Sequence, residues 1–105
     1  MSRYEFTEQG ERDLENIIDY TVTKWGRPQA DKYIDGLEQL TQKLADQPDI
    51  GTGRSDLYAG LLSFPYTSHV LYFVKQPHGI TVIRVLHKHM MPGRHIDAKS
   101  DLKAK

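Results

Sequence analysis

Two stretches in the first half of the chain carry apolar residues at helical spacing. Thr7 is suited to cap the first stretch, Gly26 ends it, Pro28 fits the first turn of the second, and Pro48 ends that one. The apolar positions are Leu14, Ile17, Ile18, Thr21, Val22 and Trp25, then Ala30, Tyr33, Ile34, Leu37, Leu40 and Leu44. The spacing predicts two amphipathic helices in an antiparallel hairpin, with Asp13 outside the apolar stripe.

The pattern changes in the second half to the short apolar runs of strands. These runs are residues 61–64, 69–75 and 80–89. The connections between them are too short for parallel crossovers, so we expect antiparallel hairpins. Residues 3–6 alternate enough to join the same sheet, and residues 46–60 are turn formers that we expect Leu57 and Tyr58 to pin to the core. The order β-α-α-β-β-β predicts an α+β fold, a helical hairpin packed on a mainly antiparallel sheet.

The last run is apolar on both faces. Regular alternation puts Ile83, Val85, His87 and His89 on one face, and Val82, Arg84, Leu86 and Lys88 on the other. A helical hairpin can cover only one face of the sheet. The other face, with Tyr72, Val82 and Leu86 as candidates, must be covered by the C-terminal tail or by another protein.

Length and composition set further bounds. The 105 residues fit one domain, which we place at residues 1–96, followed by a flexible tail at 97–105. The chain has no cysteine and no apolar run of the roughly 18 residues that a membrane span needs, which indicates a cytoplasmic protein. We expect no cofactor and no metal, because three imidazoles without a cysteine or a nearby carboxylate are a thin ligand set.

The zero net charge hides a strong asymmetry. Residues 1–53 hold 11 acidic and 6 basic side chains, whereas residues 54–105 hold 3 acidic and 8 basic ones together with all five histidines. A surface that attracts an acidic partner must therefore be built mostly from the second half of the chain.

Several motifs lie within this order of elements. They are Trp25-Gly26 between the helices, Leu44-Ala45 and Pro48-x-x-Gly51 after them, His69, Leu71 and Tyr72 in the middle strand, and Ile83-Arg84-Val85-Leu86-His87-Lys88-x-Met90 at the end. Over residues 3–91 the chain resembles the ParE toxins of the RelE/ParE superfamily. One position departs from the family pattern, because Met91 stands where members often have Asp.

The resemblance implies a toxin of a type II toxin–antitoxin system, held in a hetero-oligomer by a cognate ParD-like antitoxin. Characterised ParE members act on DNA gyrase and trap its cleaved-DNA state, whereas the RelE-like branch cuts mRNA on the ribosome. Two alternatives to a non-catalytic gyrase poison therefore stay open. One is a ribosome-dependent mRNA endonuclease, and the other is a toxin-fold protein that keeps antitoxin binding but not toxicity.

The residues favour the non-catalytic interpretation. RNA cleavage needs a base, an acid and a cation, for which Arg84, His87 and His89 are the candidates, but no carboxylate opposes them in the predicted sheet. We expect contact with the target at Arg84, His87, Lys88, His89 and Arg94, and with the antitoxin at Tyr72, Val82 and Leu86 and in the groove beside the helical hairpin. An alternative role for Arg84 is an ion pair or tail contact that orders the C-terminus.

Two further expectations concern surfaces. Trp25 and Tyr33 are assigned to the core rather than to a stacking platform. Without a phosphate loop or a recognisable DNA-reading helix, we expect no direct, sequence-specific nucleic-acid binding.

Overall fold

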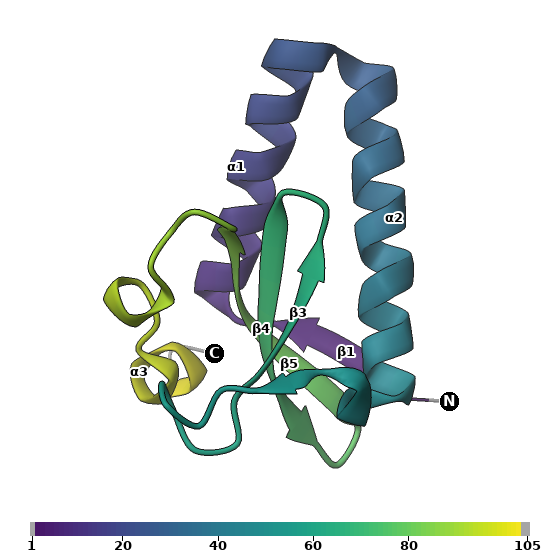
Figure 1. Ribbon diagram of the computed structural model, residues 1–105. Helices are drawn as coiled ribbons and strands as arrows, with labels where there is room; N and C mark the ends of the chain where they lie inside the picture. Colours follow the sequence, from purple (N-terminus) through teal and green to yellow (C-terminus); the bar gives the residue numbers. More distant parts are fainter. Residues whose placement is uncertain (1, 104–105) are drawn as a thin grey trace.

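The computed structural model describes residues 2–103 (Figure 1). Its elements follow the predicted order and continue beyond it. They are β1 (Arg3–Phe6), α1 (Glu8–Trp25), α2 (Arg27–Asp46), the 3₁₀ turn η1 (Pro48–Ile50), β2 (Thr52–Gly53), β3 (Leu62–Tyr66), β4 (His69–Gln76), β5 (Gly79–His87), the 3₁₀ turn η2 (Pro92–Arg94) and α3 (Ala98–Lys103).

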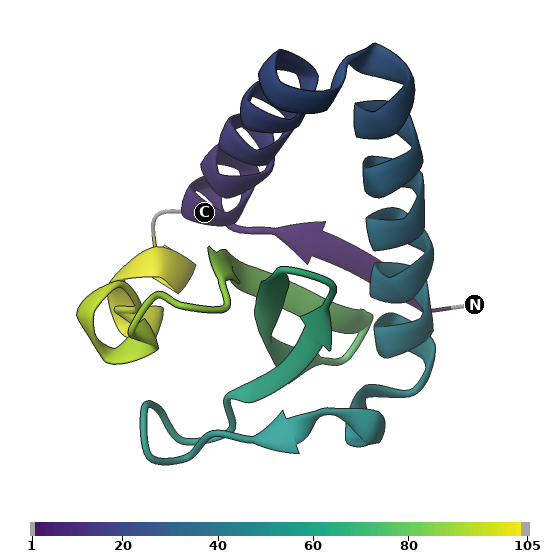
Figure 2. The same cartoon turned by 45° about the horizontal axis from the view of Figure 1, so that its top comes forward.

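The strands form one sheet in the order β1-β5-β4-β3-β2. Neighbouring strands are antiparallel except β1, which lies parallel to β5. The α1–α2 hairpin packs on one face, while the C-terminal segment lies at the other side, as the two views in Figures 1 and 2 show. The predicted α+β class and the helical hairpin on a mainly antiparallel sheet are confirmed.

The strand ends differ from the prediction for local reasons. β3 extends to Tyr66, beyond the end of the predicted run at 61–64, and therefore includes Pro65. Its missing N–H is tolerated because β2 pairs only with Leu62 and Ser63 and leaves the outer edge at Pro65 uncovered. β5 ends at His87 rather than His89, since the N–H of Met90 turns back to the His87 carbonyl. The two-residue strand β2 was not predicted.

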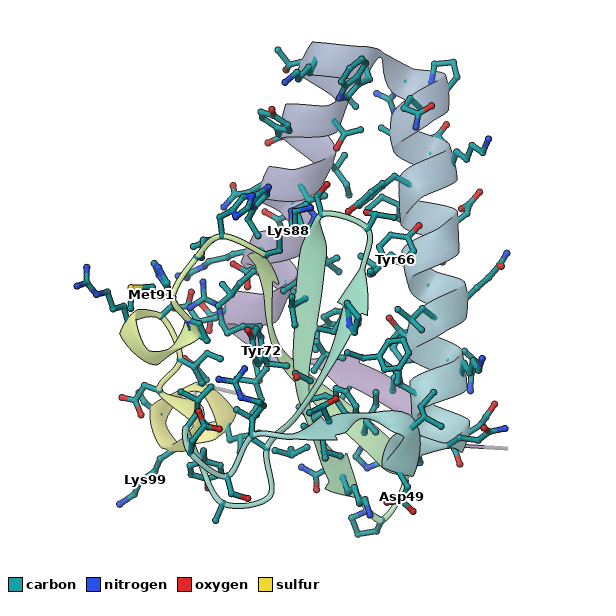
Figure 3. The ribbon with its side chains drawn as sticks, in the orientation of Figure 1. Asp49, Tyr66, Tyr72, Lys88, Met91 and Lys99 are labelled. Atoms are coloured by element: carbon teal, nitrogen blue, oxygen red, sulfur yellow. The ribbon has the colours of Figure 1, made fainter. Side chains whose placement is uncertain are left out.

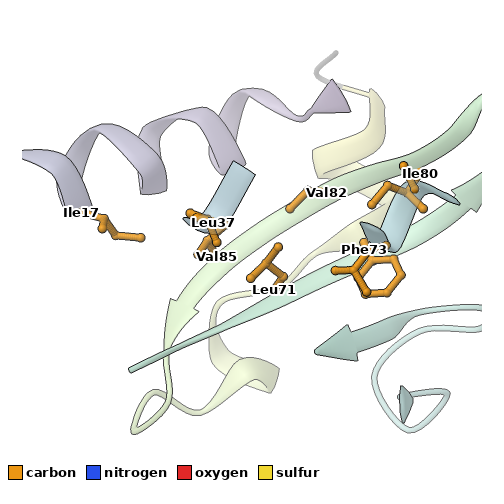
Figure 4. Packing of buried hydrophobic residues seen from close by; sticks show 9 residues of the cluster. Ile17, Leu37, Leu71, Phe73, Ile80, Val82 and Val85 are labelled. Atoms are coloured by element: carbon orange, nitrogen blue, oxygen red, sulfur yellow. The ribbon is translucent and has the colours of Figure 1, made fainter. Parts of the chain in front are cut away.

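The helix-side core joins the hairpin to the middle of the sheet. Its buried members are Ile17, Leu37, Leu44, Ala45, Leu71, Phe73, Ile80, Val82 and Val85 (Figure 4). Tyr33 packs against this cluster as predicted, whereas Trp25 is 64% exposed and its assignment to the core was wrong. The connecting end of the hairpin projects beyond the sheet, so the last residue of the α1 stripe has no strand beneath it (Figure 1).

The far side of the sheet is covered by the chain itself. Tyr72 and Leu86 belong to a second cluster with Leu61, Val74, Ile83 and Ala98, and Leu57, Val70, Ile96 and Leu102 pack around it. The first of the two predicted covers, the C-terminal segment, is therefore the one observed, with the loop at residues 54–61 beside it. Leu57 pins that loop as expected, whereas Tyr58 is exposed and does not. Residues 98–103 of the expected flexible tail form α3; residues 104–105 lie outside the described residues.

A β-bulge in β5 overturns the predicted alternation. Tyr72 pairs with Arg84 and Phe73 with Val82, which leaves Ile83 as an extra residue. As a result Val82 lies in the helix-side core and Ile83 in the far-side cluster, the reverse of our expectation for both. Tyr72 and Leu86 do share a face, but Val82 does not join them.

Thr7 holds the bulge in place. Its N–H donates to the Val82 carbonyl at 3.0 Å and its hydroxyl to the Ile83 carbonyl at 2.7 Å, while the hydroxyl oxygen accepts from the Gly10 N–H at 3.0 Å. One fully buried side chain thus caps α1 and satisfies the bulge carbonyl that the sheet leaves unpaired. A Cβ on Gly10 would approach the Val82 carbonyl oxygen to 3.0 Å, so this glycine permits the close contact between α1 and β5.

We predict that Thr7→Val lowers the free energy of unfolding by about 2 kcal/mol, because the variant loses an N-cap and leaves a buried carbonyl unpaired. Urea denaturation measures the loss. The matched control is Thr23→Val on the exposed face of α1, which we expect to be neutral. A Thr7→Val protein as stable as this control would show that the bulge does not depend on Thr7.

Candidate functional site

A groove lies between α1 and the end of the sheet where β5 ends and β3 turns into β4. This groove has a volume of about 980 Å³. Its walls come from α1, the start of α2, the β3–β4 turn and the end of β5. The residues that line it include Asp13, Tyr20, Lys24, Trp25, Tyr33, His69, His87 and Met90.

The α1 wall of the groove carries exposed aromatic side chains. Tyr20 is 61% exposed and Trp25 64% exposed. Lys24 links them, since its ammonium donates to the Tyr20 hydroxyl at 3.1 Å and lies 5.5 Å from both ring centres. Met90 adds an exposed apolar side chain from the segment after β5. Apolar surface gathered in a groove is typical of a protein-binding site.

The sheet wall of the groove carries a Tyr–His cluster. The hydroxyl of Thr67 donates to the Tyr33 hydroxyl oxygen at 2.6 Å, and that oxygen lies 2.7 Å from Nδ1 of His69. The His69 and His87 rings meet edge to face with their centres 5.5 Å apart, and the centres of the His87 and His89 rings are 5.1 Å apart. The cluster ties α2 to the β3–β4 turn and to the end of β5.

The hydrogen bonds of this cluster connect side chains with backbone groups. The Tyr33 hydroxyl, which accepts from Thr67 and shares a hydrogen bond with Nδ1 of His69, also lies 3.5 Å from the Tyr66 carbonyl oxygen, and Nδ1 of His87 accepts the His89 N–H at 3.2 Å. Burial, together with the neighbouring His87, lowers the pKa of His69 below 6.5, while Asp13 opposes the shift.

Arg84 is held by a residue that the sequence did not connect with it. Its Nε and Nη2 donate to the two carboxylate oxygens of Asp13 at 2.7 and 2.9 Å, and its Nη1 donates to the His95 carbonyl at 2.6 Å. Asp13 also accepts the Val85 N–H at 2.9 Å, and the paired side chains are only 12% and 15% exposed. The bonds to Asp13 raise the pKa of Arg84.

This arrangement corrects two expectations. A carboxylate does oppose Arg84, but it comes from α1, where the apolar stripe had placed Asp13 on the solvated side. The alternative considered for Arg84 was an ion pair or a tail contact, and its side chain makes an ion pair with Asp13 and a hydrogen bond to the His95 carbonyl. The sequence does contain a signal for this pair. A single arginine in an apolar strand needs a nearby anion, and Asp13 directly precedes Leu14, the first residue of the apolar stripe that packs on the sheet.

The other residues of the predicted target site are exposed. His87, Lys88 and His89 lie at the end of β5 and just beyond it, where Figure 3 labels Lys88. Arg94 lies in η2. Within residues 2–103, neither Lys88 nor Arg94 has a carboxylate partner. The predicted patch therefore consists of two exposed cations with exposed histidines, without the guanidinium of Arg84.

The residues predicted to bind the antitoxin are buried. Tyr72 and Leu86 lie under the C-terminal segment and Val82 lies on the opposite side of the sheet. The groove beside the helical hairpin, the other predicted site, is open. In the part of the chain that the structure describes, no three His, Cys, Asp or Glu side chains are grouped to hold a metal ion. None of the described helices is long and apolar enough to cross a membrane.

The lowered pKa of His69 predicts a pH dependence of stability. The folded state favours the neutral ring, so its contribution is present above about pH 6.5 and is lost as the pH falls through the lower, folded-state pKa. Urea unfolding between pH 7.5 and about pH 5.5 should show a smaller loss of stability for His69→Gln than for the parent. The control is His95→Gln, an exposed histidine, which should follow the parent. Equal slopes for all three proteins would contradict the prediction.

Comparisons with known proteins agree with this architecture. A family profile described as "ParE toxin of type II toxin-antitoxin system, parDE" matches residues 4–92. Toxin ParE1 of Mycobacterium tuberculosis is 32% identical over 96 residues, covering 90% of this chain and 98% of the relative. Toxin ParE1 of Caulobacter vibrioides is 29% identical over 96 residues, with 91% and 99% covered.

The similarity extends to a third curated relative and a solved structure. Toxin ParE of Escherichia coli is 31% identical over 91 residues, covering 86% of this chain and 88% of the relative. A structure of the chromosomal ParDE toxin–antitoxin system from P. aeruginosa has the same fold, with a TM-score of 0.70 at 20% identity over 83% of this chain and 96% of that one. The chain therefore belongs to the family of ParE toxins of type II toxin–antitoxin systems.

Proposed function

We propose that this toxin acts in the cytoplasm, poisons DNA gyrase without catalysis, and is neutralised by a ParD-type antitoxin that occupies the groove. The open groove with its exposed aromatic wall is the observation that supports binding of the antitoxin there. The gyrase part rests on family membership and on the exposed cations after β5. The two surfaces adjoin at His87–Met90, so one partner bound in the groove would also hinder access to the cations.

The groove suits an amphipathic segment of a partner. Tyr20, Trp25 and Met90 offer apolar contact, while Lys24 and His87 offer positive or proton-donating groups at the same walls. Among the described residues that line the groove, Asp13 is the one acidic side chain, and Arg84 already pairs with that carboxylate. A helix with apolar residues on one face and acidic residues at its margins complements these walls.

Replacing Trp25 by Ala should weaken antitoxin binding by about tenfold or more, because large aromatic side chains carry much of the energy of protein interfaces. The fold should be unaffected, since the side chain is mostly exposed. Titration calorimetry with the cognate antitoxin measures the affinity, and thermal unfolding checks the fold. Tyr58→Ala, an exposed tyrosine outside the groove, is the control; equal affinities for the two variants would place the antitoxin elsewhere.

Contact with gyrase is assigned to Lys88, His89 and Arg94 in the segment after β5. Gyrase that holds cleaved DNA is an acidic target, and exposed cations accelerate association with such a surface. Arg84 is not a direct contact in this proposal, because its Nε, Nη1 and Nη2 all donate to groups within the chain. His87 belongs to both surfaces, at the mouth of the groove.

We predict that Lys88→Ala and Arg94→Ala each slow the association with gyrase, with an effect that shrinks as salt is raised, since exposed charges act mainly on the association rate. Supercoiling and DNA-cleavage assays at low and moderate salt measure the poisoning. Lys99→Ala in α3, another exposed lysine, serves as the control. If neither variant differs from this control at low salt, the segment after β5 is not the effector surface.

The absence of catalysis has its own test. Arg84 is occupied by Asp13 and the His95 carbonyl, which argues against its use as the cation for a phosphorane. His89→Gln should then keep its toxicity, whereas loss of a general acid or base would cost about 100-fold to 10,000-fold in rate. Primer extension on cellular mRNA after induction should show no new 5′ ends. Ribosome-dependent cuts that disappear in His89→Gln would replace the gyrase assignment by an mRNA endonuclease.

A further inference from the structure

Residues 88–95 form a loop that is hydrogen-bonded to the rest of the chain near both ends, and near the first end the N–H groups of His89 and Met90 also donate to His87. At the first end, the Lys88 N–H donates to the Ser68 carbonyl at 2.8 Å. At the second end, Nη1 of Arg84 donates to the His95 carbonyl at 2.6 Å. Between these bonds the loop carries the exposed cations Lys88 and Arg94. The second bond joins a backbone carbonyl of the loop to a side chain of β5.

The guanidinium that makes this second bond is oriented by α1. Asp13 engages Nε and Nη2 of Arg84 through both carboxylate oxygens, and this two-point contact fixes the plane of the guanidinium. Asp13 is itself fixed, because it accepts the Val85 N–H and is almost buried. The direction of Nη1, and with it the position of the His95 carbonyl, therefore depends on a carboxylate of the first helix.

We propose that Asp13 is a positioning residue for the loop at residues 88–95, acting through Arg84. The inference rests on the proposed function in one respect: the loop is the surface that meets the target. Asp13 holds Lys88 and Arg94 at a fixed separation before the target arrives. A loop that is already ordered loses less conformational freedom on binding, which favours affinity without adding a contact.

The geometry also assigns the two members of the pair different roles. Asp13 contributes no contact to the loop itself, and Arg84 contributes one. An asparagine at position 13 keeps the shape of the side chain, but its amide presents a donor to Arg84 where a carboxylate oxygen accepted. The two-point contact that fixes the plane of the guanidinium is then lost, so the guanidinium can rotate. We expect the hydrogen bond to the His95 carbonyl to break while the strands of the sheet stay paired.

The test is amide hydrogen exchange of the free, full-length toxin, followed site by site. In Asp13→Asn, the amides of Arg94, His95 and Ile96, which bond within η2, should exchange at least about tenfold faster than in the parent. The amides of Leu71 and Phe73 in the central strand should change by less than about twofold. Asp19→Asn, an exposed acid on the same helix, is the matched control and should leave both groups unchanged.

A second variant keeps the inference testable if Asp13→Asn folds poorly. Arg84→Lys retains a positive charge for Asp13 but lacks the fork that spans Asp13 and the His95 carbonyl, so it should loosen the same three amides. Association with gyrase should slow in both variants and not in Asp19→Asn. Exchange at 94–96 no faster than in the control, or central-strand amides accelerated equally, would overturn the positioning role.

The two hypotheses can fail separately. A loosened loop with unchanged gyrase poisoning would confirm that Asp13 orders the loop, overturn the inference that this order favours target binding, and leave the target standing. If the parent protein does not affect gyrase at all, the proposed target is wrong, and the exchange measurements alone decide whether Asp13 positions the loop.

Discussion

One extra residue in β5 determines how the two halves of this molecule meet. Without the bulge at Ile83, strict alternation would put Val82 on the far side of the sheet and Ile83 under the helices. With it, Val82 and Val85 both reach the helix-side core, and Ile83 and Leu86 both reach the far-side cluster. Thr7 satisfies the carbonyl groups of Val82 and Ile83, so the start of α1 is attached to the bulge itself.

That attachment brings the next residues of the two elements together. Asp13 lies less than two turns beyond Thr7 on α1, and Arg84 follows the bulge directly on β5. Their ion pair is protected from solvent and is completed by the Val85 N–H and the His95 carbonyl, which is the condition under which a desolvated pair is tolerated. Helix α1, strand β5 and the C-terminal segment are thereby linked through one guanidinium.

The sequence was sufficient for the parts of the fold that depend on periodicity. The helical stripes, Gly26 between the helices and the short connections of the meander predicted the hairpin, the antiparallel strands and the α+β class. Alternation failed at Val82 and Ile83, because a bulge is fixed by contacts with Thr7 and Gly10, some seventy residues away, and leaves no local signature. Trp25 was misassigned for a related reason: periodicity gives the face of a helix, but not the point at which the sheet beneath it ends.

The candidate site could be predicted only in part. The groove beside the hairpin was expected, but the Tyr33–His69 contact that forms its wall depends on tertiary packing between α2 and the β3–β4 turn. Asp13 was missed because its position outside the apolar stripe is also that of a solvated acid. Tyr72 and Leu86 were expected at a partner surface because a strand pattern cannot distinguish a face covered by the chain's own C-terminal segment from one covered by another protein.

The central claim is that Arg84 is an internal tie between α1 and the C-terminal segment. The most direct measurement is the solvent exchange of arginine Nε protons by nitrogen-detected NMR, with the exposed Arg94 in the same sample as reference. The account predicts that the Nε–H of Arg84 exchanges much more slowly than that of Arg94, and that Asp13→Asn removes most of the difference. Equal exchange of the two arginines in the parent protein would contradict it.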